Sequence, residues 1–219
     1  MTELRLLLAT TNQGKIREIR EALKGLPLKV FDLRDVLRGG SYRERGRTFL
    51  ENARGKSLYY SRAWDGLTLA EDSGLEIEAL HGAPGVHSAR FSRPEPSDEK
   101  NIRKVLRLLR GVPRPERKAR FVCTMVLAKD GKPVREFRGE VRGRIGLEPR
   151  GSNGFGYDPV FYYAPKRKTF AELPPGAKNR VSHRGRALRK LKRYLAAAAA
   201  AAPAVRLRRV PRRAPSGRR

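Results

Sequence analysis

The sequence predicts a single α/β domain, and three local patterns support that fold class. An apolar stretch over residues 4–9 runs into a polar loop and then into apolar residues at helical spacing. Thr48 has the features of a helix N-cap, and two long strand patterns flank Asp130-Gly131-Lys132, which is typical of a hairpin turn. At 219 residues the chain is long enough for one substantial core.

In the amino-terminal half, strand and helix patterns alternate along the chain. The expected elements are a strand over 4–9, a helix carrying Ile16, Ile19, Ala22 and Leu23, a strand over 28–33, a loop through Gly39, Gly40 and Gly46, a helix from Thr48 with Glu51 completing a capping box, and strands over 67–70 and 75–79. Between the last two strands, Glu71, Asp72 and Ser73 are expected to form a sharp acidic turn.

The carboxy-terminal half predicts a helix, a long hairpin and a final helix. The expected elements are a turn at Pro84-Gly85, a helix from Ser97 carrying Ile102, Val105, Leu106 and Leu109, strands over 119–128 and 134–145, a glycine-rich loop through Gly151, Gly154 and Gly156, an extended segment over 159–163, and a helix over 181–195. Cys123 is expected to lie in the core of its strand.

The chain ends in a segment of different composition. Residues 196–202 are all alanine and can extend the last helix, since alanine has the best helix propensity, and Pro203 ends it. The following Arg- and Pro-rich residues are expected to be disordered, because they offer little apolar surface to bury. We therefore expect a folded domain over 1–195 and a basic tail over 196–219.

Charge and cysteine content narrow the classes of function. The formal net charge of +28 suggests a nucleic-acid partner, but no Asp or Glu follows Glu172, so much of the excess is expected to belong to the tail. Cys123 is the only cysteine, which excludes a disulfide framework and fits a reducing cytoplasm. No apolar run approaches the ~18 residues of a membrane helix.

Four segments carry groups suited to phosphate chemistry. A carboxylate-rich turn at a strand end suits magnesium, which takes one or two carboxylates plus substrate oxygens. Residues 10–15 combine hydroxyl, amide and ammonium groups with a helix start, where anions bind, although they lack the Walker spacing. The loop over 151–159 offers glycines beside Phe155 and Tyr157, on which a base can stack. Lys178, His183 and Arg184 add donors near the last helix.

Each segment also has a simpler interpretation when it is taken alone. The acidic residues form an ordinary solvated turn, residues 10–15 a plain helix start, and the glycine loop a segment rigidified by its aromatic rings. The three donors near the last helix can be surface charge, and His183 can be a cap or a hydrogen-bond donor to a ligand. Only the combination of segments favours a site.

The combination resembles the inosine/xanthosine triphosphate pyrophosphatase family over about residues 4–195. The blocks that carry the resemblance occur in one order: Ala9-Thr-Thr-Asn-Gln-Gly-Lys15, Thr48-Phe-Leu-Glu-Asn-Ala53 with Lys56, Ala70-Glu-Asp-Ser-Gly-Leu75, Pro84-Gly-Val-His-Ser-Ala-Arg90, Gly154-Phe-Gly-Tyr-Asp-Pro159 and Ser182-His-Arg184. The resemblance implies a two-lobed α/β fold with a long central mixed sheet, helices on its faces and an active-site cleft between the lobes. It further implies magnesium-dependent hydrolysis of ITP, dITP and XTP to the monophosphate and pyrophosphate, usually by a homodimer.

Individual roles follow from the same resemblance. Asp72 matches the proton acceptor and metal ligand, Lys56 meets the triphosphate, and Glu44 is the second metal carboxylate, with Glu51 and Glu71 as competitors because Arg45 replaces a usual threonine. The residues implied in substrate binding are Thr10, Thr11, Asn12, Gln13, Gly14 and Lys15 for phosphate, Ser73 for the nucleotide, Phe155, Gly156, Tyr157 and Asp158 for base and sugar, and Lys178, His183 and Arg184 for the 6-keto purine or phosphates.

Two other classes remain open at this stage. A Maf-like nucleotide pyrophosphatase has a related fold and a different specificity, and the Ser-His-Arg and Phe-Gly-Tyr-Asp blocks argue against it. A basic nucleic-acid-binding protein would interleave basic residues with aromatics or carry a known motif, and neither is found before residue 196. Nucleic acid is therefore expected to meet this chain only through weak contacts of the tail.

Overall fold

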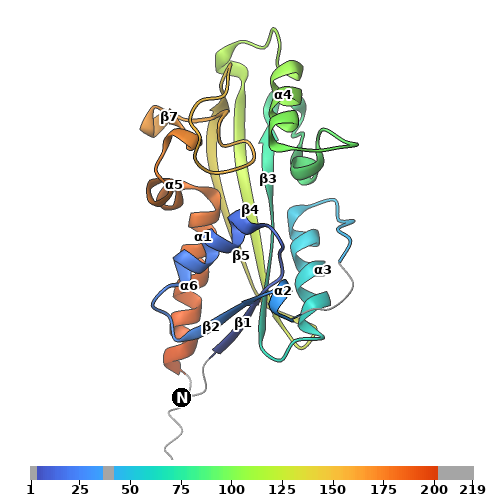
Figure 1. Cartoon of the computed structure of the whole chain (residues 1–219), viewed down its shortest axis with the longest axis vertical. Helices are drawn as coiled ribbons and strands as arrows, with labels where there is room; N and C mark the ends of the chain where they lie inside the picture. The colour runs from blue at the N-terminus through green and yellow to red at the C-terminus, as the bar shows by residue number, and fades with distance from the viewer. Residues whose placement is uncertain (1–3, 37–41, 202–219) are drawn as a thin grey trace, which may run out of the picture.

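The computed structural model describes residues 4–36 and 42–201 and contains one mixed sheet flanked by helices (Figure 1). Its strands are β1 (Leu4–Leu8), β2 (Leu28–Asp32), β3 (Leu67–Ile77), β4 (Lys118–Lys129), β5 (Lys132–Ile145), β6 (Phe161–Tyr163) and β7 (Lys168–Thr169). Its α-helices are α1 (Gln13–Leu23), α2 (Leu33–Val36), α3 (Phe49–Ser61), α4 (Asp98–Leu108), α5 (Pro175–Val181) and α6 (His183–Ala201). Short 3₁₀ turns occupy Glu78–Leu80, Gly85–Arg90, Arg114–Glu116, Ala164–Lys166 and Phe170–Glu172.

The sheet has seven strands in the order β2-β1-β3-β4-β5-β6-β7. β1 pairs in parallel with β2 and β3, whereas every pair from β3 to β7 is antiparallel. The long hairpin of β4 and β5 turns at Asp130 and Gly131, whose positive φ values of 50° and 72° suit a tight two-residue turn. The expected α/β class with a central mixed sheet is confirmed.

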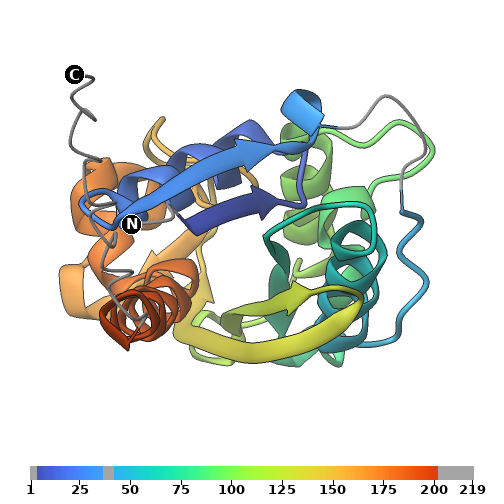
Figure 2. The ribbon, with the colours of Figure 1, turned by 90° about the horizontal axis from the view of Figure 1, so that it is seen from below.

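Strand alternation divides the lower part of the molecule into two apolar cores. Leu6 and Leu8 of β1 face α1 and α6, where they join Ile16, Ile19 and Leu188 in one cluster. On the opposite face, another cluster consists of Leu7, Ala9, Tyr60, Trp64 and Ala70. The two faces are visible in Figures 1 and 2, where α6 and α3 lie on opposite sides of the strands.

A third cluster fills the upper lobe, where α4, β6 and β7 lie (Figure 1). It packs Ile102 and Val105 of α4 against the upper parts of the long strands and against Phe161 and Phe170. β3, β4 and β5 run through both lobes, so a residue halfway along β3 lies at the junction between them.

The acidic turn expected at Glu71, Asp72 and Ser73 is wrong. These residues lie inside β3, which is continuous from Leu67 to Ile77, and they pair with Met125, Thr124 and Cys123 of β4. Ten consecutive pairs with β4 supply a hydrogen-bonding ladder that overrides the turn preference of Asp-Ser-Gly. Cys123 is fully buried in β4, as expected.

Several helix boundaries differ from their predictions. Thr48 caps α3 by accepting from the Glu51 N–H, but the Glu51 carboxylate accepts from the Arg47 N–H at 2.8 Å, so the capping box is only half formed. The extended segment predicted over 159–163 is a strand only from Phe161. β2 passes directly into the short helix α2, which the periodicity did not indicate.

The final helix predicted over 181–195 is interrupted. Ser182 is extended, with ψ of 161°, and separates α5 from α6. α6 continues into the alanine run as far as Ala201, which confirms that the alanines extend it. Among the described helices none is both long and apolar enough to cross a membrane. Gly39, Gly40 and the tail over 202–219 lie outside the described residues.

Gly139 is expected to be essential for the docking of α6 on β5. A Cβ at this position would lie 2.1 Å from the His183 carbonyl oxygen and 2.7 Å from the Ala187 nitrogen, both backbone atoms. Gly139→Ala must therefore displace α6, and we predict that the free energy of unfolding falls by about 2–3 kcal/mol. Denaturant unfolding measures the change.

Gly176→Ala is the matched control, because its nearest neighbour is a flexible Arg180 nitrogen at 3.8 Å. It lies within α5, where alanine is preferred to glycine, so its stability should be unchanged or slightly higher. Equal stability of the two variants would contradict the packing described.

Candidate active site

The candidate site lies where β3 extends beyond the end of β1. The last register pair joins Leu8 to Leu69, and the Ala9 N–H still donates to the Leu69 carbonyl at 2.8 Å. From Ala70 to Leu75, β3 pairs with β4 on one edge, and the segment that follows β1 brings Lys15 beside Glu71. A strand alternates its side chains, so Glu71 and Ser73 face the α6 side whereas Asp72 faces the α3 side.

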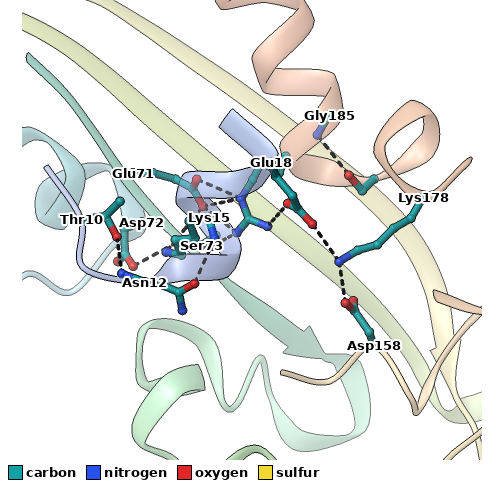
Figure 3. Close-up of polar contacts among 12 residues, drawn as sticks. Thr10, Asn12, Lys15, Glu18, Glu71, Asp72, Ser73, Asp158, Lys178 and Gly185 are labelled. Carbon is teal, nitrogen blue, oxygen red and sulfur yellow. Dashed lines mark hydrogen bonds and ion pairs between the residues drawn. The ribbon is translucent and has the colours of Figure 1, made fainter. Parts of the chain in front are cut away.

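The loop over 10–15 is a capped helix start. The Asn12 side chain accepts from the Lys15 N–H at 3.0 Å, and the Thr10 hydroxyl accepts from the Asn12 N–H at 3.2 Å (Figure 3). Lys15 Nζ lies 3.5 Å from Glu71 Oε1. Gly14 permits a close approach from the upper lobe, because a Cβ there would lie 2.7 Å from the Phe155 ring.

Asp72 is held by backbone and amide donors on the α3 side of β3. Its Oδ2 accepts from Asn52 Nδ2 at 2.9 Å, and its Oδ1 accepts from the Ser73 N–H at 3.0 Å. Asn52 is fully buried, and its own oxygen accepts from the Gly46 N–H at 2.7 Å. The segment that carries Glu44 is thereby tied to α3 and to Asp72.

Two lysines bring positive charge to this wall. Lys56 Nζ donates to the Glu71 carbonyl at 2.9 Å and pairs with the Glu44 carboxylate. Burial raises the pKa of Asp72 above its ordinary value; nearby Lys15 opposes the shift and the Glu44 carboxylate adds to it. A carboxyl that holds its proton more strongly than usual is better matched to proton transfer near neutral pH.

Asp72 and Glu44 can take part in holding a hard divalent cation. Both line the same cavity, and such a cation prefers one or two carboxylates completed by substrate oxygens. Nowhere in residues 4–36 and 42–201 do three or more His, Cys, Asp or Glu side chains gather as a cation site. The donors therefore fit a cation shared with a ligand rather than an all-protein cage.

A chain of alternating charges crosses the α6 side of the site. In order, it consists of Lys15, Glu71, Arg184, Glu18, Lys178 and Asp158. Arg184 contacts both Glu71 oxygens, with N–O distances between 2.8 and 3.1 Å, and donates to Glu18 at 2.7 Å. Lys178 continues the chain, lying 3.1 Å from Glu18 and 2.5 Å from Asp158. Figure 3 shows the chain running from the first helix towards the upper lobe.

The buried pair of Glu71 and Arg184 lies at the centre of this chain. Their side chains are 1% and 2% exposed, respectively. Burial alone would raise the pKa of Glu71, but the Arg184 guanidinium and the Lys15 ammonium outweigh burial, so its pKa lies well below the ordinary value. Glu71 is therefore ionised and fully occupied by cations, which removes it as a competitor for a metal.

The aromatic loop of the upper lobe closes the site. Asp158 Oδ2 accepts from the Phe155 N–H at 2.9 Å and thereby fixes the loop. The Phe155 ring lies 4.8 Å from Lys178 Nζ and 5.2 Å from the Arg184 guanidinium carbon, within range of cation–π attraction. The Tyr157 hydroxyl donates to the Ser88 carbonyl at 2.8 Å. An aromatic face is thus held beside fixed donors.

His183 has an environment suited to a neutral ring. Burial, and then the neighbouring Arg184 charge, lower its pKa well below the ordinary value. Its ring stacks on Phe121 with centroids 4.6 Å apart, and its buried Nδ1 has no hydrogen-bond partner among the described residues. His183 is therefore not a permanent cation at neutral pH.

One cavity of about 390 Å³ collects nearly all of the residues named from the sequence. Of the predicted site residues, only Gln13 and Gly14 do not line it: Gln13 bonds to the Thr11 carbonyl and to Arg34, and Gly14 contacts Phe155. Glu51, the other competing carboxylate, does not line it either. The cavity volume is in the range of small-molecule sites.

The structure adds two residues that sequence reasoning missed. Glu18 joins Lys178 to Arg184, and Asn52 holds Asp72. The signal for Glu18 was its spacing of three from Lys15, which places both on one helix face. Asn52 lay within a quoted block, but only the tertiary contact with β3 reveals its role.

Comparison with known proteins agrees with this fold. The family model described as Ham1 family matches residues 6–194. A protein of Geobacter sulfurreducens named dITP/XTP pyrophosphatase is 48% identical over 191 residues, which cover 87% of this chain and 96% of the relative. A Bacillus subtilis protein of the same name is 41% identical, with coverages of 87% and 96%.

Solved structures match at the level of the whole domain. A HAM1 protein from Coxiella burnetii has a TM-score of 0.80 and 39% identity, and the match covers 88% of this chain and 98% of that one. The Staphylococcus aureus Ham1 protein has a TM-score of 0.80 and 36% identity, with coverages of 89% and 99%. With the family model matching most of its length, this chain belongs to the Ham1 family.

Proposed function

We propose that this chain is a nucleoside triphosphate pyrophosphatase that converts dITP, ITP and XTP to the monophosphate and pyrophosphate. The observation that carries the proposal is the single cavity in which Lys15, Asp72 and Lys178 meet, although they come from distant parts of the chain. The relatives named dITP/XTP pyrophosphatase support the same substrate class. Neither a Maf-like specificity nor a primary nucleic-acid-binding function gains support from these matches.

The cavity suits a purine nucleotide laid from the helix start to the aromatic loop. The phosphates lie near residues 10–15, where helix N–H groups and Lys15 favour negative charge. Lys56 of α3 neutralises phosphate charge from the α3 side of β3. At the other end, the base stacks against Phe155 and reaches Lys178, His183 and Arg184, while Ser73, Gly156, Tyr157 and Asp158 shape the pocket between.

Hydrolysis breaks the bond between the α-phosphorus and the oxygen that bridges it to the β-phosphorus. A water oxygen forms the new bond to the α-phosphorus, and the bridging oxygen leaves with pyrophosphate. Asp72 orients this water and accepts its proton, for which its raised pKa is suited. Asn52 holds the carboxylate in place, and Lys15 and Lys56 stabilise the negative charge on the phosphates.

Magnesium is the cation we propose for Asp72 and Glu44. When bound with a triphosphate, it neutralises phosphate charge and so makes pyrophosphate a better leaving group. Glu44 pairs with Lys56 in this structure, so the lysine is placed beside the same phosphates.

The hydrogen-bond donors at the base end of the cavity determine which purine bases bind. A 6-keto purine offers an acceptor to the donors of Lys178, Arg184 and a neutral His183, whereas ATP offers an amino group. Donors left unpaired in a buried site cost binding free energy, and a site of this kind rejects the wrong partner strongly. The network on Lys178 and Arg184 keeps these donors in fixed positions.

The remaining features of the proposal rest on resemblance and composition. We propose that the enzyme is a homodimer, as the family resemblance implies, and that it acts in the cytoplasm, which fits a lone buried cysteine. We also propose that the catalytic unit is the segment over 1–195 and that the basic residues beyond it have an accessory role.

A nucleotide panel tests the proposed function. We expect pyrophosphate release from ITP, dITP and XTP with magnesium, and at least about 100-fold lower kcat/KM for ATP and UTP, since a site built on donors rejects a mismatched base. Coupled detection of pyrophosphate is the measurement. If UTP were preferred, the Maf-like alternative would replace this proposal, and no release from any triphosphate would refute it.

Asp72→Asn tests the catalytic assignment. Loss of the proton acceptor should lower kcat for ITP by about 10²- to 10⁴-fold. Stability should not fall, because the neutral amide is easier to bury than a carboxylate. The readouts are kcat and the thermal unfolding midpoint.

Asp65→Asn is the matched control, since Asp65 is 94% exposed and pairs with Arg5 at the surface. Its kcat should equal that of the unmodified chain. Near-normal turnover in Asp72→Asn would exclude Asp72 from the chemistry.

A further inference from the structure

A row of cations on α6 faces away from the active site. Arg186, Arg189, Lys190 and Arg193 are exposed and follow the spacing i, i+3, i+4, i+7, so they form one stripe along the helix. We call these four residues the α6 stripe. No carboxylate follows Glu172 in the chain, so no residue of α6 can neutralise the stripe from within the helix. Like charges at this spacing repel one another.

The α6 stripe forms one wall of a groove whose other wall is β5. Arg138, Gly139 and Glu140 line the β5 side, and the groove has a volume of about 710 Å³. Gly139 brings the two walls together, because it allows the α6 backbone to approach β5 closely. The groove and the active-site cavity share no lining residue. It is therefore a separate feature of the surface.

Within residues 4–36 and 42–201, the cations of the α6 stripe form no ion pair with a carboxylate. Arg186, Arg189 and Lys190 donate to the backbone carbonyls of Val181, Arg180 and Arg138, at 3.2, 2.9 and 2.7 Å. The only carboxylate in the lining is Glu140, and it is paired with Arg138 at 3.1 Å. A guanidinium has five donors, so each arginine retains donors for an external anion.

The tail is not the main source of the positive charge. Residues 202–219 contain seven of the fifty Lys and Arg residues, so 43 cations remain against 22 carboxylates in the rest of the chain. This corrects the assignment of much of the excess to the tail. A partner for the folded domain must therefore be considered.

We propose that this groove binds the phosphate backbone of double-stranded nucleic acid without reading its bases. The α6 stripe spans about 10 Å, as seven residues rise by ~1.5 Å each, which matches several phosphates of a duplex that carries one charge per ~1.7 Å of its axis. Arginines, which predominate in the stripe, bind phosphate oxygens in a bidentate manner.

The side chains that line the groove also argue against two other anionic partners, single-stranded nucleic acid and a membrane surface. Binding of single strands relies on aromatic side chains that stack with bases, and the groove has none. Insertion into a membrane surface requires large apolar side chains beside the cations. The exposed large apolar residues of the described chain are Tyr59, Leu108, Val134 and Leu147, and none of them lines the groove.

The chain offers a control with the same charge at a distant place. Arg103, Arg107 and Arg110 are exposed on and just after α4, at spacings similar to those of the α6 stripe. α4 lies in the upper lobe, far along the molecule from α6 (Figure 1). If binding depended only on net charge, neutralising either set of three arginines would weaken it equally.

The test measures binding of a fluorescent duplex of about 20 base pairs to the full-length chain, between about 50 and 200 mM salt. We expect R186Q/R189Q/R193Q to weaken binding by about 10-fold or more and to reduce the slope of log K against log salt by about 2–3, at ~0.9 per lost contact. R103Q/R107Q/R110Q should change affinity by less than about 3-fold. Circular dichroism verifies that both variants are folded.

Two further measurements distinguish binding by the groove from binding by the tail and from binding to a membrane. A full-length variant with glutamine at all seven arginines of 202–219 isolates the tail, and vesicles containing phosphatidylserine replace the duplex to examine a membrane. Retained duplex affinity in the tail variant would support the groove. Equal weakening by the two triple variants, loss of binding only in the tail variant, or tighter stripe-dependent binding to vesicles would each overturn it. None of these results depends on the proposed pyrophosphatase activity.

Discussion

The buried ion pair between Glu71 and Arg184 is the interaction on which the rest of the site depends. Glu71 lies in the middle of a strand, and its carboxylate cannot be ionised there without a partner, since burying an unpaired charge costs several kcal/mol. Arg184 satisfies both carboxylate oxygens and extends to Glu18, which in turn places Lys178. One pair therefore connects β3, α1, α5 and α6. The same connection relates the phosphate end of the cavity to the end where we propose that the base binds.

Strand geometry assigns separate tasks to neighbouring residues. Because side chains alternate across β3, Glu71 faces Arg184 while Asp72 faces Asn52 and the cavity wall that carries Lys56 and Glu44. The Glu71 carboxylate is thus paired with cations on its side of the sheet, whereas burial raises the pKa of Asp72 above its ordinary value. In a turn, these two carboxylates would not be divided between opposite faces of a sheet.

Much of the fold was predictable because its signals are local. The capped starts of α3 and α4, and the positive-φ turn at Asp130 and Gly131, depend on a few adjacent residues. The errors arise where distant residues decide. Pairing with β4 made Glu71, Asp72 and Ser73 a strand despite their turn chemistry. The helix predicted over 181–195 missed α5 and included Val181, which the extended Ser182 separates from α6, since apolar spacing does not reveal a single extended residue.

The candidate site was predictable as a set of blocks but not as a network. The motif blocks contain most of the cavity lining, whereas the partner of each residue depends on the fold. Glu71 was placed among possible metal ligands because Arg45 departs from the family pattern beside Glu44, and only the contacts of Glu71 with Arg184 and Lys15 show otherwise. Charge counting failed in a similar way, because it could not distinguish the cations paired with carboxylates in the cavity from those of the α6 stripe, which have no carboxylate partner among the described residues.

If Glu71 and Arg184 act as one coupled unit, a double-mutant cycle will show a large interaction energy between them. The free energies of unfolding of Glu71→Gln, Arg184→Met and the double variant are compared with that of the unmodified chain. We expect each single change to cost about 3–5 kcal/mol, because it leaves a buried partner unpaired, and the double change to cost at least about 2 kcal/mol less than the sum of the two. Additive losses would show that the two residues are independent, and the site would then not depend on their pairing.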